Sequence, residues 1–176
     1  RAAGLDARPP RDPVQLHGSG HRHPVGAAVR RICLFAGYDR DGLVDDYVVA
    51  YVRELARHAD VYYLADCEMR PGELDKLAPH VKGAWAERHG GYDFGSYSRL
   101  IHQLGWERIA GYDELLLVND SCYLLRPLDG VFAHMDARAC DWWGLQATKG
   151  IAATMDVVSN RFRTPIPMDV VRGSLL

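Results

Sequence analysis

The chain has 176 residues, a length that fits about one domain. Hydrophobic residues make up 48% of it and charged residues 25%, an ordinary globular composition that excludes extensive disorder. The formal net charge is −2, so no basic excess points to a nucleic-acid partner. No apolar stretch approaches the roughly 20 residues that a membrane span needs, and the first residues lack the apolar core of a signal peptide.

Four cysteines are scattered along the chain: Cys33, Cys67, Cys122 and Cys140. None belongs to a CxxC pair, which argues against a zinc site. Each lies in or just after an apolar run, where a free cysteine behaves as a small hydrophobic residue. We therefore expect reduced thiols in a cytoplasmic protein. Because the chain begins at an arginine and ends inside an apolar segment, we also expect a fragment whose domain is incomplete at its C-terminus.

Residues 1–28 are expected to form a flexible linker or tail. Residues 1–25 hold four of the nine prolines, with several Arg, His and Gly and no apolar period. His17, His21 and His23 could be taken for a metal-binding tract, but a polar linker is the favoured interpretation. Residues 29–176 then form the folded domain.

Short apolar runs bounded by polar residues predict buried strands, and apolar residues three and four apart predict helices. The predicted strands are residues 32–36, 61–65, 81–87, 114–118 and 141–145. Four helices are predicted. The first follows a cap at Asp45 or Asp46, the second starts at Pro71, the third covers residues 97–104, and the fourth starts at Pro127 or Asp129. Residues 88–96 and 146–160 are expected to be loops.

Strands that alternate with helices in this way predict an α/β fold. Such an order implies a mostly parallel sheet with right-handed crossovers and helices on both faces. In an open sheet of this kind, ligands bind outside the carboxyl ends of the strands. The polar triplet Asn119-Asp120-Ser121, directly after the strand at residues 114–118, therefore stands where a site is expected.

Aspartates occupy four successive strand-to-helix transitions, at Asp39, Asp66, Asp93 and Asp120. Because the carboxyl ends of parallel strands meet at one edge, we expect these side chains to lie along that edge. Any one of them could merely cap the next helix, which is a frequent role of Asp. Four at the same edge favour a binding site.

Several familiar sites are excluded by missing motifs. The chain has no GxxxxGK[ST] phosphate loop, no GxGxxG after its first strand and no GxSxG elbow. A hydrolase centred on Ser121 would need a base that only the fold could supply, such as His102 or His134. Carboxylates without a phosphate loop instead suit Mg²⁺ or Mn²⁺ bound together with a nucleotide diphosphate.

Three segments carry a family resemblance: YDFGSYSRLIHQLGW, YDELLLVNDSCYLLRPL and CDWWGLQATKG. They look like the rhamnan synthesis protein F family of bacterial polysaccharide glycosyltransferases, and FAGYDRDG…DDYVVAYVRELARHADVYYLAD resembles the start of that family. The resemblance covers about residues 32–176. It implies a Rossmann-like fold of the GT-A type. It also implies transfer of rhamnose or a related deoxysugar from a nucleotide-diphosphate donor, with dTDP-rhamnose expected.

The resemblance assigns roles to individual residues. In GT-A enzymes a loop of the N-x-G type opens a helix, and a later strand ends in a D-x-D metal motif. Asp93-Phe94-Gly95 and Asn119-Asp120-Ser121 fall at these positions, which makes Asp120 the expected metal ligand. The donor-binding residues are expected to be Asp39, Asp66, Tyr92, Asp93, Gly95, Asn119 and Ser121.

The sequence departs from the D-x-D pattern because only Asp120 of the triplet is a carboxylate. One carboxylate can still hold Mg²⁺ together with diphosphate oxygens and water. A metal-independent site stays open, in which helix N–H groups, Arg88 or Arg99 would stabilise the leaving diphosphate. Asp141 is the only candidate general base from the last strand, but it stands at the start of that strand, so the base is left unassigned.

Aromatic residues near the strand ends could stack on a base or on a sugar. The candidates are Tyr92, Tyr97, Trp142 and Trp143. Core packing is the favoured interpretation for Tyr97 and Trp142, whereas Tyr92 in a glycine-rich loop is open between the two.

The predicted function is transfer of a sugar, expected to be rhamnose, to a growing cell-surface polysaccharide. The acceptor is expected to be an oligosaccharide or a lipid-linked glycan, with peripheral association at the inner face of the plasma membrane. The alternative is a non-catalytic nucleotide-sugar-binding or scaffold module of a larger polysaccharide-assembly protein. The reduced metal motif and the incomplete domain favour that alternative.

Overall fold

The computed structural model describes residues 29–138 and 143–145. Its elements, in chain order, are β1 Arg31–Gly37, α1 Asp46–Leu55, β2 Asp60–Ala65, the 3-10 turn η1 Leu74–Lys76, β3 Gly83–Ala86, α2 Tyr92–Leu104, α3 Trp106–Ala110, β4 Glu114–Asn119 and α4 Asp129–Asp136. The predicted linker, the histidine tract, Cys140, Asp141, Trp142 and the loop at 146–160 lie outside the described residues.

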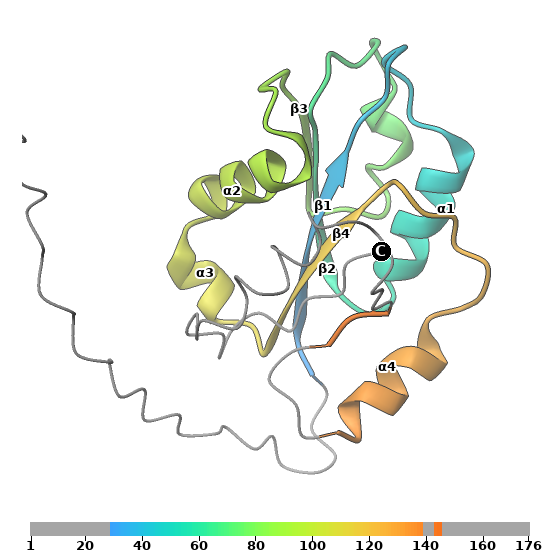
Figure 1. The fold of residues 1–176 in the computed structure, drawn as a ribbon, viewed down its shortest axis with the longest axis vertical. Coiled ribbons are helices and arrows are strands. Elements are labelled where there is room, and N and C mark those ends of the chain that lie inside the picture. The colour runs from blue at the N-terminus through green and yellow to red at the C-terminus, as the bar shows by residue number, and fades with distance from the viewer. Residues whose placement is uncertain (1–28, 139–142, 146–176) are drawn as a thin grey trace, which may run out of the picture.

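A four-stranded sheet in the order β3-β2-β1-β4 forms the centre of the fold (Figure 1). All neighbouring strands are parallel, so the predicted α/β fold with a parallel sheet is confirmed. β1 is central, and its Ala36 pairs with Leu64 of β2 and Asn119 of β4. The carboxyl ends of these three strands therefore lie at one level, here called the carboxyl edge; the opposite side is the amino edge.

Helices cover both faces of the sheet, as the continuous apolar strands predict. Cys33 and Phe35 of β1 belong to the core cluster that includes the apolar residues of α1 and α4. Ile32 and Leu34 belong to the cluster on the other face, with residues of α2 and α3. Figure 1 shows α1 on one side of the strands and α2 with α3 on the other. Full burial of each such side chain contributes roughly 1.5–3 kcal/mol.

The first helix forms where it was predicted but without the expected side-chain cap. Asp45 occupies the N-cap position, yet its side chain makes no capping hydrogen bond. Asp46 is the first helical residue, where its negative charge favours the positive end of the helix dipole. Burial of Val48, Tyr51 and Val52 against the sheet stabilises this helix instead.

Four expectations about the other elements were wrong. Helix α2 begins at Tyr92, so half of the predicted loop at 88–96 is helical. The connection after Gly105 contains a five-residue helix, α3, which is too short to show a period in the sequence. The helix expected from Pro71 is only the single turn η1. The described part of the predicted last strand, residues 143–145, is not a strand.

The described cysteines are free, as predicted. Cys33 and Cys67 are buried and Cys122 is partly buried, without disulfides among them. Burial raises the pKa of the Cys33 thiol, which keeps it protonated.

Candidate functional site

The structure brings Asp93, Asn119 and Asp120 together at the carboxyl edge. Asn119, the last residue of β4, donates from its amide Nδ2 to Oδ2 of Asp93 over 2.7 Å. The next residue, Asp120, accepts through Oδ2 a 2.6 Å hydrogen bond from the backbone N–H of Tyr38, which follows β1. Two strand ends and the first turn of α2 thus meet at Asp120, as the parallel topology predicts.

Within the described part of the chain, Asp120 is a carboxylate without a cationic partner. No Lys, Arg or His in the described stretches forms an ion pair with it. Burial raises the pKa of Asp120 to about 6, the Tyr38 N–H opposes that shift, and the carboxylates of Asp93 and Asp39 add to it. At neutral pH the Asp120 side chain is ionised, and its buried charge destabilises the folded protein. A bound cation would remove that destabilisation.

Two buried polar atoms close to Asp93 have no hydrogen-bond partner in the described structure. They are the amide oxygen Oδ1 of Asn119 and the hydroxyl of Tyr97, one turn after Asp93 on α2. Burial raises the pKa of Tyr97, and the charges of Asp93 and Asp120 contribute. Because nearly all buried polar atoms in folded proteins are paired, each of these two atoms can take a further hydrogen-bond partner such as a ligand or water. Tyr97 is otherwise part of the core, as predicted.

Asp66, directly after β2, binds the backbone of the loop that leads into α2. Its two oxygens accept from the N–H groups of His89, Gly90 and Tyr92 at 2.7, 2.8 and 2.8 Å. Burial would raise the pKa of Asp66, but these donors outweigh it and lower the pKa. The carboxylate shapes the loop and is 7% exposed, so its contact with a nucleoside stays a prediction.

Asp39 closes the turn after β1 with one of its oxygens. Oδ1 accepts from the N–H groups of Asp41 and Leu43 at 2.8 and 2.9 Å. No hydrogen bond from a described residue reaches Oδ2, which therefore stays available to a ligand. The donor-binding role of Asp39 stays a prediction.

Tyr92 and Gly95 lie in the first turn of α2, not in a loop. Tyr92 has φ +53°, a strained value for a residue with a side chain, and its ring is 81% exposed. A Cβ on Gly95 would lie 2.9 Å from the ring of His89. Glycine is thus required at position 95 because the ring of His89 lies so close to it. The approach of a ligand to Gly95 stays a prediction.

An arrangement that the sequence does not reveal links Asp66, His89 and Ser96. Nε2 of His89 lies 3.0 Å from Oγ of Ser96, and Nδ1 lies 3.3 Å from Oδ2 of Asp66, which resembles a hydrolase triad. Two facts exclude that role. Ser96 is fully buried, and Nδ1 accepts from the N–H of Gly91 at 3.1 Å, so this nitrogen is not the donor to Asp66 that a triad requires.

The remaining candidates are less involved. Ser121 is exposed, and no described histidine hydrogen-bonds to it, which removes the serine hydrolase centred there. Arg99 pairs with Glu87 at 3.3 Å, whereas Arg88 is exposed. Trp143 is buried, and its indole N–H donates to Glu114 at the start of β4, so it lies at the amino edge.

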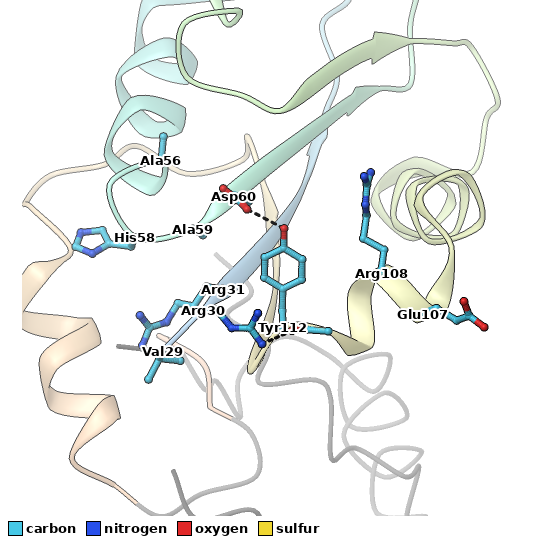
Figure 2. A pocket seen from close by; sticks show the side chains of 11 residues that line it. Val29, Arg30, Arg31, Ala56, His58, Ala59, Asp60, Glu107, Arg108 and Tyr112 are labelled. Carbon is cyan, nitrogen blue, oxygen red and sulfur yellow. Dashed lines mark hydrogen bonds between the residues drawn. The ribbon is translucent and has the colours of Figure 1, made fainter. Parts of the chain in front are cut away.

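The structure also has a cavity of about 600 Å³ at the amino edge (Figure 2). It is lined by residues at the starts of the strands, including Arg31 and Asp60, and by Tyr112, whose hydroxyl donates to Asp60 over 2.7 Å. Because open parallel sheets bind ligands at their carboxyl ends, the carboxyl edge stays the candidate functional site.

Fold and site together define a Rossmann-like α/β protein with a partly buried carboxylate, Asp120, at the carboxyl edge of its sheet. The chain belongs to the rhamnan synthesis protein F family, whose family model matches residues 61–164. The match begins at β2 and is therefore shorter than the resemblance over residues 32–176. Membership ties the chain to rhamnan synthesis and hence to polysaccharide biosynthesis. No protein of curated function and no solved structure matches the chain.

Proposed function

We propose that the chain is the donor-binding part of a glycosyltransferase of the GT-A type that takes rhamnose from a nucleotide diphosphate. The observation that carries the proposal is Asp120, a partly buried carboxylate at the carboxyl edge that forms no ion pair with a cationic side chain among the described residues. Family membership supports the substrate class, because rhamnan is a polymer of rhamnose. Rhamnosyl transfer from dTDP-rhamnose is the specific activity proposed.

The residues at the carboxyl edge fit Mg²⁺ or Mn²⁺, which prefer oxygen ligands. Asp120 offers an ionised carboxylate, and the unpartnered Oδ1 of Asn119 offers a second oxygen. Asp39, Asp93 and Asp120 do not form a ready three-carboxylate cage. The group of three possible ligands that lies within 4.8 Å in the described residues is elsewhere. Asp120 is thus the proposed metal ligand, with substrate oxygens and water completing the coordination.

The residues around Asp120 would act by holding the donor. A bound divalent ion would supply neutralisation of the diphosphate charge. Asn119 fixes Asp93 through its amide. The N–H of Tyr92 already donates to Asp66, so the next N–H groups of α2, those of Asp93 and Phe94, are the proposed donors to phosphate oxygens at the positive end of that helix. Tyr92, exposed beside this helix start, is proposed to stack on the base or the sugar. In the proposed transfer an acceptor hydroxyl oxygen bonds to the anomeric carbon, the bond from that carbon to the diphosphate breaks, and the nucleoside diphosphate leaves. The hydroxyl proton passes to a general base that is left unassigned.

The acceptor is proposed to be an oligosaccharide or a lipid-linked glycan, reached in the cytoplasm at the inner face of the plasma membrane. None of the described helices is both long enough and apolar enough to cross a membrane. The membrane association proposed is therefore peripheral for the described residues.

A second candidate function is a non-catalytic nucleotide-sugar-binding or scaffold module. It is favoured by the carboxylates of Asp39 and Asp66, which bind the chain's own backbone N–H groups. A scaffold of this kind would bind the donor at the same edge without turning it over.

A donor screen by thermal unfolding tests the proposal. At a donor concentration 100-fold above Kd, binding should stabilise the protein by about 2.7 kcal/mol. We expect this with dTDP-rhamnose and Mn²⁺, and a loss of the Mn²⁺-dependent part in Asp120→Asn. The exposed Asp41, changed to Asn, is the matched control. Stabilisation by no nucleotide sugar would contradict the proposal. Binding without turnover in the full-length parent protein would favour the scaffold.

A further inference from the structure

Three side chains with metal-binding atoms converge between α1 and α4, at the amino edge and away from Asp120. Glu54 is in the last turn of α1, His58 follows that helix, and Asp129 opens α4. One ligand atom from each lies within 4.8 Å of the others. Figure 2 shows His58 beside the cavity of the amino edge, on the side toward α4.

The imidazole of His58 is held with one nitrogen directed at the two carboxylates. Its Nε2 is buried and has no hydrogen-bond partner in the described structure. That atom lies 3.6 Å from Oε1 of Glu54 and 3.9 Å from Oδ1 of Asp129, both too long for hydrogen bonds. The ring packs on Phe132 with a centroid distance of 4.6 Å, so it is not free to turn toward solvent.

These distances are close to those in a shared coordination sphere. Ligand atoms bound about 2.0–2.1 Å from a tetrahedral Zn²⁺ are roughly 3.4 Å apart. The separations of 3.6 and 3.9 Å need only a small contraction to reach that value. We propose that Glu54, His58 and Asp129 form a zinc site, with water in the fourth position. Asp129 is 54% exposed at its side chain, which leaves room for that water.

Neighbouring groups orient the two carboxylates. The N–H of Leu128 donates to Oε1 of Glu54 over 2.8 Å, and Arg57 donates to Glu54 and to Asp129, each over 2.8 Å. The hydrogen bonds from Arg57 and then from Leu128 lower the pKa of Glu54. Outer partners of this kind are typical of metal ligands. Two carboxylates and one guanidinium leave a net negative charge that attracts a cation.

The proposed ion would join two helices that are far apart in the sequence. α1 and α4 lie on the same face of the sheet and share one core cluster. Zinc would fix the start of α4 to the end of α1, and so make the amino edge more rigid. The alternative is an ion-pair cluster in which a protonated His58 contacts both carboxylates without a metal.

A competition titration against a chromophoric chelator measures the zinc affinity directly. The full chain is used with His17, His21 and His23 changed to Gln, because that tract could bind zinc itself. We expect one zinc per chain. His58→Gln and Asp129→Asn should each weaken binding at least tenfold, since each removes a ligand, and the exposed His102→Gln is the matched control. Co²⁺ in place of zinc should give the intense visible absorption of a tetrahedral site.

Two results would overturn the proposal. One is no zinc binding up to 1 mM in a chain whose circular dichroism shows it to be folded, and this outcome would assign the cluster to ion pairing alone. The other is equal zinc affinity in His58→Gln and His102→Gln. Because Asp129 is exposed, Asp129→Asn still reports on zinc binding if the packed His58 variant fails to fold.

Discussion

Asp120 makes the stability of the free protein depend on pH in an unusual direction. Its pKa rises from 3.8 to about 6 on folding, through burial and the nearby carboxylates. That shift corresponds to roughly 3 kcal/mol of destabilisation when the group is ionised in the native state. The cost is complete above pH 6 and fades as the pH falls toward 4, because the native carboxyl takes up its proton first.

Replacing Asp120 with Asn should therefore stabilise the protein at pH 7.5. We expect the free energy of unfolding to rise by about 1–3 kcal/mol, with the gain shrinking as the pH is lowered to 4. Asn keeps an oxygen that can accept the N–H of Tyr38. Urea unfolding at several pH values measures the effect, with Asp41→Asn as the control. A destabilised Asp120→Asn at pH 7.5 would show that the carboxylate is not strained.

Asp66 should behave in the opposite way. Asn at this position keeps one acceptor oxygen but turns an N–H donor toward the N–H of Tyr92, where Oδ2 accepts now. We expect a loss of about 1–3 kcal/mol at pH 7. The pKa of Asp66 is lowered in the native state, so this contribution is present above pH 4 and decreases as the pH falls through the native pKa. Hydrogen exchange at Gly90 and Tyr92 should accelerate, and unchanged exchange there would contradict the assigned role.

At the scale of elements, two helical glycines offer a matched comparison. A Cβ on Gly95 of α2 would lie 2.9 Å from the ring of His89, whereas a Cβ on Gly130 of α4 meets nothing within 4 Å. We expect Gly95→Ala to cost about 1–3 kcal/mol by displacing His89, and Gly130→Ala to gain about 0.5–1 kcal/mol. Thermal unfolding of both variants measures this. Equal effects would mean that His89 does not limit the start of α2.

The start of α2 also shows where sequence interpretation stops. Gly90, Gly91 and the strained Tyr92 have the local composition of a loop. The helix begins there because Asp66, 23 to 26 residues earlier, accepts hydrogen bonds from this segment. The local sequence pattern of residues 88–96 does not reveal a hydrogen bond to a residue so far away in the chain. In contrast, β1, β2 and β4 were predicted within one residue at each end, because burial on both faces requires an unbroken apolar run.

The candidate site likewise has a part that could be predicted from the sequence and a part that could not. Topology alone predicted that Asp93, Asn119 and Asp120 would gather, since parallel strands end at one edge. The hydrogen bonds that backbone N–H groups donate to Asp66 and Asp39 could not be predicted, because they depend on the backbone conformation of two turns. Equally hidden were the buried Ser96–His89 pair and the approach of Asp129 to Glu54 and His58, because Asp129 is distant from the other two along the chain.

At the scale of the whole molecule, a buried ion pair joins the sheet to α4. Arg31 of β1 pairs with Glu114 of β4 and with Asp136 at the end of α4, and its guanidinium lies 4.6 Å over the ring of Phe132. The Arg31 and Glu114 side chains are 6% and 1% exposed. Trp143 donates to the same glutamate, so residues distant in sequence are held at the amino edge.

Changing Arg31 to Met should be strongly destabilising. Glu114 would be left as a buried charge without its cation, at a cost of about 3–5 kcal/mol. Adding Glu114→Gln removes that charge and keeps an acceptor for Trp143, so the double variant should recover most of the loss. Chemical denaturation of the two single variants and the double variant gives the coupling. Additive effects would mean that the pair does not act as a unit.

The most direct test of the central claim is to locate the donor on the folded chain. Amide chemical shifts are recorded while dTDP-rhamnose is added in the presence of Mg²⁺. Donor binding at the carboxyl edge predicts that the largest changes occur at Tyr38, Tyr92 and Asn119, and that their Mg²⁺-dependent part disappears in Asp120→Asn. Changes confined to Arg30, Arg108 and Tyr112, which line the cavity at the amino edge, would contradict it.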